Sequence, residues 1–105
     1  MSAFSPEGLL ALSGTLLAIG LFGILTRRNF ILLLISIEIA INAAVLNFVY
    51  FAAFAGAQGG LSGQAIAVVV IGLAATEVAV GLAIVLALNR LRGSINVAEA
   101  ATLKL

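Results

Sequence analysis

The sequence of 105 residues contains no cysteine and no histidine. Without these side chains, the chain cannot ligate an iron–sulfur cluster, a histidine-bound haem or an ordinary zinc ion. Its five basic and four acidic residues leave a net charge of +1, with no basic stripe of the kind that binds nucleic acid. These absences exclude those three kinds of metal centre in this chain and give no indication of a nucleic-acid partner; we expect neither a metal nor nucleic acid.

Charge is scarce as well. Charged residues make up 9% of the chain, against about 25% in a typical soluble domain. Hydrophobic residues make up 64%, and the mean hydropathy is +1.32. So few charges cannot solvate the surface of a small globule, whose surface-to-volume ratio is unfavourable. A soluble domain is therefore excluded, and the lipid bilayer is the expected surrounding.

Three apolar stretches follow one another, over about 8–26, 30–54 and 64–88. Each is close to the roughly 20 residues that a helix needs to cross a bilayer. The basic turn 27–29 and the glycine-rich segment 55–63 are predicted to be loops, and residues 89–105 a charged tail. The sequence thus predicts an all-α integral membrane protein, with three transmembrane helices in a single membrane domain over residues 1–105.

The first helix has a recognisable start. Ser5 is a plausible N-cap, Pro6 suits the first helical position, and Glu7 lies where the helix dipole favours an acid. No basic residue precedes the first apolar stretch, so we expect a retained span and not a cleaved signal peptide.

The basic residues predict the orientation. They lie in the first loop and in the tail, at Arg27, Arg28, Arg90, Arg92 and Lys104. Basic residues concentrate on the inner side of a membrane. The N-terminus is therefore expected outside and the C-terminus inside.

Two acidic residues interrupt the apolar stretches, and they are the candidate catalytic residues. Glu38 lies ten residues after Arg28, or about 15 Å of helix, and Glu77 lies thirteen residues before Arg90, or about 20 Å. Both carboxyls are thus expected near the midplane, within about 5 Å of each other in height. An ionised side chain is costly there, and such residues commonly belong to proton pathways. On adjacent helices, this pair suits proton transfer parallel to the membrane.

Polar residues on the second stretch form two opposed faces. Asn42 shares the face of Glu38, whereas Ser36 and Asn47 share the opposite face. This pattern predicts that protein covers the second helix on both sides.

Small residues mark the other two stretches. Ala74 and Gly81 flank Glu77 on its own face, which allows either close helix approach or room for water. On the first stretch, Ala11, Gly14 and Ala18 form a strip that predicts helix packing.

Simpler interpretations of the charged residues stay open. An intramembrane glutamate can be a structural hydrogen-bonding group, and Arg27 and Arg28 serve first of all as orientation signals. No Lys, Arg or His lies within any apolar stretch, so neither glutamate has a cationic partner in the chain.

Three segments carry a resemblance to a known family: 26–29 (TRRN), 35–43 (ISIEIAINA) and 74–83 (AATEVAVGLA). Together they resemble the subunit K family of proton-pumping NADH-quinone oxidoreductases, the respiratory complex I family, over nearly the whole chain. The resemblance implies that Glu38 and Glu77 relay protons along the membrane and that Arg27 and Arg28 match the first-loop arginines of the family. Thr76 departs from the expected alanine; its hydroxyl would bond the backbone or tune Glu77.

The resemblance also implies partners and a place in the cell. The chain would be a non-redox subunit of the translocase, with no catalytic activity alone and no cofactor or metal of its own. Flavin, iron–sulfur clusters and quinone would belong to other subunits. Its neighbours would be J-like and N-like subunits, with A-like and H-like subunits in the same membrane arm. A bacterial or archaeal inner membrane is expected, with an organelle membrane as an alternative.

Two other functions compete. The nearer is the C subunit of a multisubunit Na+/H+ antiporter, which resembles this chain but has no redox partner. The other is a self-assembling structural or pore-forming membrane protein without partner subunits.

Overall fold

The computed structural model describes residues 5–54, 56–92 and 97. Within these residues the chain forms three helices, α1 (Pro6–Thr26), α2 (Phe30–Phe54) and α3 (Gly56–Arg92). All three are long and apolar enough to cross a membrane. The prediction of an all-helical chain with three membrane-spanning helices is confirmed.

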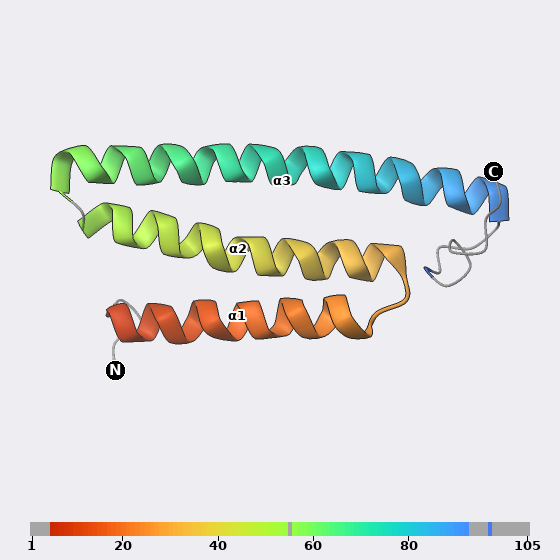
Figure 1. The fold of residues 1–105 in the computed structure, drawn as a ribbon, viewed down its shortest axis with the longest axis horizontal. Coiled ribbons are helices and arrows are strands. Elements are labelled where there is room, and N and C mark those ends of the chain that lie inside the picture. The colour runs from red at the N-terminus through yellow and green to blue at the C-terminus, as the bar shows by residue number, and fades with distance from the viewer. Residues whose placement is uncertain (1–4, 55, 93–96, 98–105) are drawn as a thin grey trace.

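The helices lie side by side in one layer, with α2 between α1 and α3 (Figure 1). Each helix runs antiparallel to the next, and the molecule measures 53 × 27 × 15 Å. The smallest dimension is little more than the diameter of one helix, about 10–12 Å with its side chains. The prediction that protein covers α2 on both sides is confirmed by its contacts with α1 and α3.

The ends of α1 and the start of α2 follow from local hydrogen bonds. The hydroxyl of Ser5 accepts a hydrogen bond from the Gly8 N–H at 3.1 Å, which confirms the predicted N-cap. Asn29 caps α2, because its side-chain oxygen accepts from the N–H groups of Ile31 at 2.9 Å and Leu32 at 3.3 Å. The three-residue loop thus ends one helix and starts the next, as predicted.

Hydroxyl groups within the helices bond to their own backbone. Three of them donate to a carbonyl oxygen four residues earlier, at 2.6–2.8 Å, in the pairs Thr15–Ala11, Thr26–Phe22 and Ser36–Leu32. These bonds satisfy polar groups that would otherwise be costly in an apolar surrounding.

Two glycines let α1 and α2 pack closely. A Cβ atom on Gly20 would lie 2.8 Å from both the Cβ and the backbone N of Ala40, and 2.9 Å from the backbone O of Ser36. Gly23 packs directly against the Ser36 side chain, which is buried. The α1–α2 contact therefore depends on backbone atoms that nearly touch.

The predicted packing strip on α1 is wrong within this chain. Ala11, Gly14 and Ala18 are exposed, and a Cβ on Gly14 would meet nothing within 4 Å. The helix instead turns Leu9, Ser13 and the two packed glycines toward α2. Small residues show where another helix can approach closely. They do not show which face of α1 packs against α2.

The loop predicted over 55–63 is wrong from Gly56 onward, because α3 already begins there. A helix satisfies its backbone groups internally, which matters more in an apolar surrounding than the low helix propensity of glycine. At the other end, Asn89–Arg92 extend α3 and are not part of a tail. Glu99 and Lys104 of the predicted tail lie outside the described residues.

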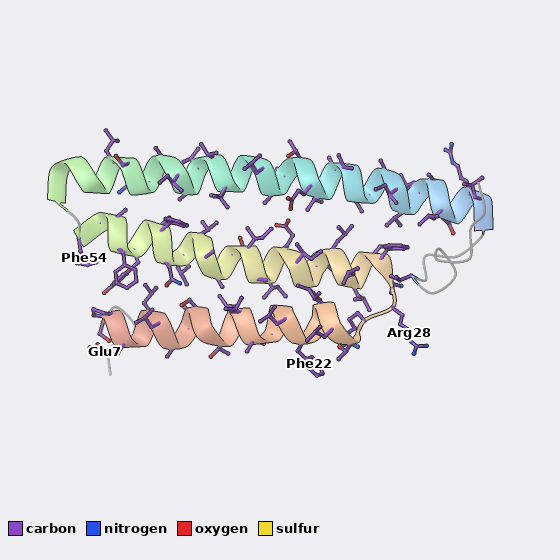
Figure 2. All side chains as sticks on the ribbon, in the orientation of Figure 1. Glu7, Phe22, Arg28 and Phe54 are labelled. Carbon is purple, nitrogen blue, oxygen red and sulfur yellow. The ribbon has the colours of Figure 1, made fainter. Side chains whose placement is uncertain are left out.

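Large apolar side chains cover the outside of the layer. Phe22, for example, points away from α1 (Figure 2) and is 62% exposed. The described core consists mainly of alanine and other small side chains. The chain therefore buries little apolar surface by itself, as expected for a protein covered by lipid and partner subunits.

Gly20→Ala is expected to lower the stability of α1–α2 packing by about 1–3 kcal/mol, because the new Cβ would collide with backbone atoms. Gly72→Ala on α3 is the matched control, since a Cβ there meets nothing within 4 Å and alanine favours the helix by about 0.5–1 kcal/mol. The measurement is the temperature at which the subunit dissociates from its purified complex. Equal temperatures for both variants would contradict the packing described here.

Candidate functional site

Two close contacts fix how α2 and α3 are aligned. A Cβ on Gly81 would lie 2.6 Å from a methyl carbon of Leu34, and a Cβ on Gly63 would lie 2.6 Å from the Cβ of Ala52. The contacts are eighteen residues apart on each helix, so they describe one consistent antiparallel alignment.

This alignment places the two candidate carboxyls at the same level. Glu38 follows Leu34 by four residues, and Glu77 precedes Gly81 by four. The contact between Gly63 and Ala52 gives the same result. Ala52 follows Glu38 by fourteen residues, and Gly63 precedes Glu77 by fourteen. The expectation that Glu38 and Glu77 share a level on adjacent helices thus agrees with the packing of the chain.

Glu38 lies half-buried at the contact between the two helices. It lines a hollow of about 230 Å³ whose other walls are apolar, formed by Ile31, Leu34, Ile35 and Ile39 of α2 and Val78 and Leu82 of α3. The hollow thus has Glu38 on one helix and Val78, the residue next to Glu77, on the other. This is the part of the site that α2 and α3 build together.

Glu77 is exposed on α3 and lines a different hollow, of about 330 Å³. Its other lining residues all come from α3: Thr76, Val80, Gly81 and Ile84. None of them lines the hollow of Glu38. Glu38 and Glu77 therefore share a level but line separate hollows, one formed by α2 and α3 together and one formed by α3 alone.

Small residues surround this level on α3. In closely packed helices, the residues at positions i, i+3, i+4 and i+7 of one helix surround a side chain of the facing helix. On α3, these positions are Ala74, Glu77, Val78 and Gly81. Glu38 is the residue of α2 at that level. Ala74 is buried, and Gly81 lies against Leu34, so of the two alternatives left open by the sequence the structure supports close helix approach.

Neither carboxyl has a cationic partner nearby. All five basic residues of the chain lie at positions 27, 28, 90, 92 and 104, outside the middle of every helix. Glu7, the other described acidic residue, lies at the opposite end of the layer from Arg28 (Figure 2). Within residues 5–54 and 56–91, no Lys or Arg therefore lies at the level of Glu38 and Glu77.

Thr76 does not act on Glu77 through a hydrogen bond. Its hydroxyl donates to the backbone O of Leu73 at 2.7 Å. Of the two roles considered for this hydroxyl, the structure supports the backbone bond. Asn42, predicted on the face of Glu38, is exposed.

Arg27 and Arg28 are exposed in the loop between α1 and α2, about 15 Å of helix away from Glu38. The Arg27 N–H donates to the Gly23 carbonyl at 3.0 Å, and the Arg28 carbonyl accepts from the Val97 N–H at 2.7 Å. The fold thus places the two glutamates at the same level of adjacent helices and the two arginines at one end of the layer. Both guanidinium groups are available to lipid or to partner subunits.

Two features escaped the sequence analysis. The contact of Leu34 with Gly81 fixes the alignment of the glutamates, yet only a trial antiparallel alignment of the two stretches would have indicated it. Asn47 has a buried side-chain oxygen with no hydrogen-bond partner among the described residues. The sequence grouped Asn47 with Ser36 on one face of the helix, but it did not indicate that the Asn47 oxygen would be buried.

Among residues 5–54, 56–92 and 97, no three His, Cys, Asp or Glu side chains lie close enough together to hold a metal ion. The ionisable groups that this level of α2 and α3 offers are the carboxyls of Glu38 and Glu77.

Comparison with known proteins identifies the family. Residues 8–105 match the family of NADH-ubiquinone/plastoquinone oxidoreductase chain 4L. Among similar proteins, NADH-quinone oxidoreductase subunit K of Anaeromyxobacter sp. (strain K) is 52% identical over 93 residues, 89% of this chain and 91% of that protein. Subunit K of Deinococcus radiodurans is 48% identical, covering 90% and 89% of the two chains. Subunit K of Bacillus anthracis is 45% identical over 99% of both chains.

These matches cover nearly the full length of both partners, and they do not favour the Na+/H+ antiporter alternative. Three membrane-spanning helices agree with them. The chain belongs to the subunit K (chain 4L) family of NADH-quinone oxidoreductase, and it is an integral membrane protein of the respiratory complex I type.

Proposed function

We propose that the chain works in the membrane arm of a proton-pumping NADH-quinone oxidoreductase, where Glu38 and Glu77 relay protons laterally and couple quinone reduction to proton translocation. One observation carries the proposal. Glu38 and Glu77 lie at the same level of adjacent helices, and no Lys or Arg of the described helices lies at that level.

The relay step conserves charge within the chain. The carboxylic acid of Glu38 gives up its proton, directly or through water, and the carboxylate of Glu77 accepts it. One acid and one carboxylate remain afterwards, so the step moves charge sideways without creating a second ion in the apolar layer. Small residues beside Glu77 support this step because they let the two helices approach closely.

Exposure gives the two carboxyls different roles. Glu38 is half-buried beside a hollow that α2 and α3 form together, whereas Glu77 is exposed beside a hollow that α3 forms alone. Glu77 is therefore the carboxyl that exchanges protons with a base on a neighbouring subunit. A cation or acid brought close by that subunit would shift the proton between Glu38 and Glu77. J-like and N-like subunits are the proposed neighbours, with flavin, iron–sulfur clusters and quinone held in other subunits.

The proposed orientation has the N-terminus outside and the C-terminus inside the cytoplasmic membrane of a bacterium. Arg27, Arg28 and Arg90 support it, because all three lie at the end of the layer away from Glu7. The bacterial relatives support the location.

Glu38→Gln and Glu77→Gln are each expected to reduce redox-driven proton pumping roughly tenfold or more, because glutamine cannot carry the proton. The measurement is the pH gradient formed by the reconstituted complex during NADH oxidation. Glu7→Gln is the control, since Glu7 is exposed in the first turn of α1. Both relay variants should assemble normally, because glutamine preserves the size of the side chain. Full pumping by Glu38→Gln would remove this residue from the relay.

Single cysteines test the orientation, and the chain has none of its own. In intact cells, a membrane-impermeant thiol reagent should label Glu7→Cys and should label Arg28→Cys only after the cells are opened. Both positions are exposed, so each is accessible from its own side. The reverse pattern would show that the N-terminus lies inside.

A further inference from the structure

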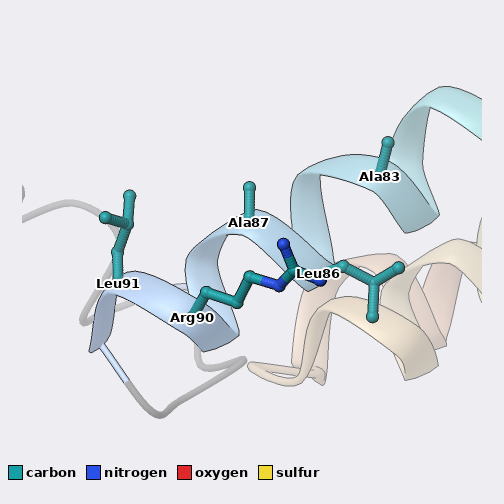
Figure 3. Close-up of a pocket in the computed structure, with 5 residues that line it drawn as sticks. All are labelled: Ala83, Leu86, Ala87, Arg90 and Leu91. Carbon is teal, nitrogen blue, oxygen red and sulfur yellow. The ribbon is translucent and has the colours of Figure 1, made fainter.

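A groove lies on the outer surface of α3, near the end of the helix. It has a volume of about 510 Å³, and its lining residues are Ala83, Leu86, Ala87, Arg90 and Leu91 (Figure 3). All five are exposed. Val85, between them in sequence, is buried instead. Ala83 and Ala87 each lie two residues from Val85, or about 200° around the helix. The groove therefore faces away from the rest of the chain.

Arg90 provides the positive charge in this groove. Its side chain runs back along α3 toward Leu86, so that the guanidinium group lies over the apolar groove (Figure 3). Arg90 forms no ion pair with any acidic side chain that the structure describes. A guanidinium group offers five N–H donors in a planar arrangement, which suits the oxygens of a phosphate.

None of the acidic residues that the structure describes lies beside the groove. Arg27 and Arg28 are exposed at the same end of the layer, whereas the described acidic residues lie at its middle or at its other end. This end therefore attracts anions. The two alanines make a shallow apolar track that begins at Arg90 and runs about 10 Å along α3 to Ala83, toward the middle of the helix.

A ligand for this groove needs an anionic group at one end and a long apolar chain at the other. We propose that the groove binds an anionic phospholipid, whose phosphate contacts Arg90 and whose acyl chain lies along Ala87 and Ala83. Basic residues at the inner membrane surface attract anionic headgroups in this way. The proposal is independent of the glutamate relay, because the groove lies on the face of α3 that points away from α2.

Photo-crosslinking of the intact purified complex in nanodiscs tests the proposal. The two probes are phosphatidylglycerol and phosphatidylcholine that carry the same photoreactive group in the acyl chain. Phosphatidylglycerol should label the segment containing Ala83 and Ala87 roughly fivefold more than phosphatidylcholine does. Equal labelling by the two lipids would overturn the proposal. Cross-linking of this segment to a neighbouring subunit in place of lipid would also overturn it.

Variants separate the charge from the groove. Arg90→Gln should remove the preference for phosphatidylglycerol, whereas Arg90→Lys should keep most of it. Ala87→Phe should reduce labelling by both lipids, because it fills the groove while Arg90 remains. Ala75→Phe is the matched control, since it adds the same bulk at an exposed position of α3 outside the groove. Unchanged labelling of Arg90→Gln and Ala87→Phe would contradict the site, and assembly of each variant is checked by its subunit content.

Discussion

The close approach of α2 and α3 at two glycines is the constraint on which the candidate site depends. Gly81 admits Leu34 and Gly63 admits Ala52, and together they fix the antiparallel alignment of the helices. That alignment sets Glu38 level with Glu77. A side chain at Gly63 would collide with the Cβ of Ala52, and one at Gly81 would force the end of the Leu34 side chain to move. An offset of one helical turn would separate the carboxyls by a further 5 Å or so along the axis. The chain therefore uses small residues to position two ionisable groups.

Much of this arrangement could be predicted from the sequence, because membrane helices obey strong constraints. An apolar surrounding requires every backbone group to be satisfied within a helix, so long apolar stretches predict helices reliably. The charged loop at Arg27 and Arg28 fixed one boundary sharply, and the opposed polar faces of α2 correctly indicated protein on both sides. Glu38 and Glu77 stood out because a carboxyl is costly in such stretches.

The errors also have physical causes. Glycines between 55 and 63 suggested a loop, but the same glycines are tolerated in a membrane helix, and Gly63 is needed for the contact with Ala52. The strip of Ala11, Gly14 and Ala18 suggested packing, yet it faces outward in this chain. Small residues permit close approach without specifying the partner. Which hollow each glutamate lines depends on how α2 and α3 are aligned. The sequence of one helix alone does not show that alignment.

Infrared difference spectroscopy of the intact complex tests the central claim most directly, because the carbonyl stretch of a protonated carboxyl is separate from that of a carboxylate. When quinone is reduced, one of the two glutamates should lose its protonated band as the other gains one. Glu38→Gln and Glu77→Gln assign the bands, and removal of either residue should abolish both changes, since each carboxyl is the other's proton partner. Carboxyl bands of Glu38 and Glu77 that stay unchanged during turnover would contradict the account.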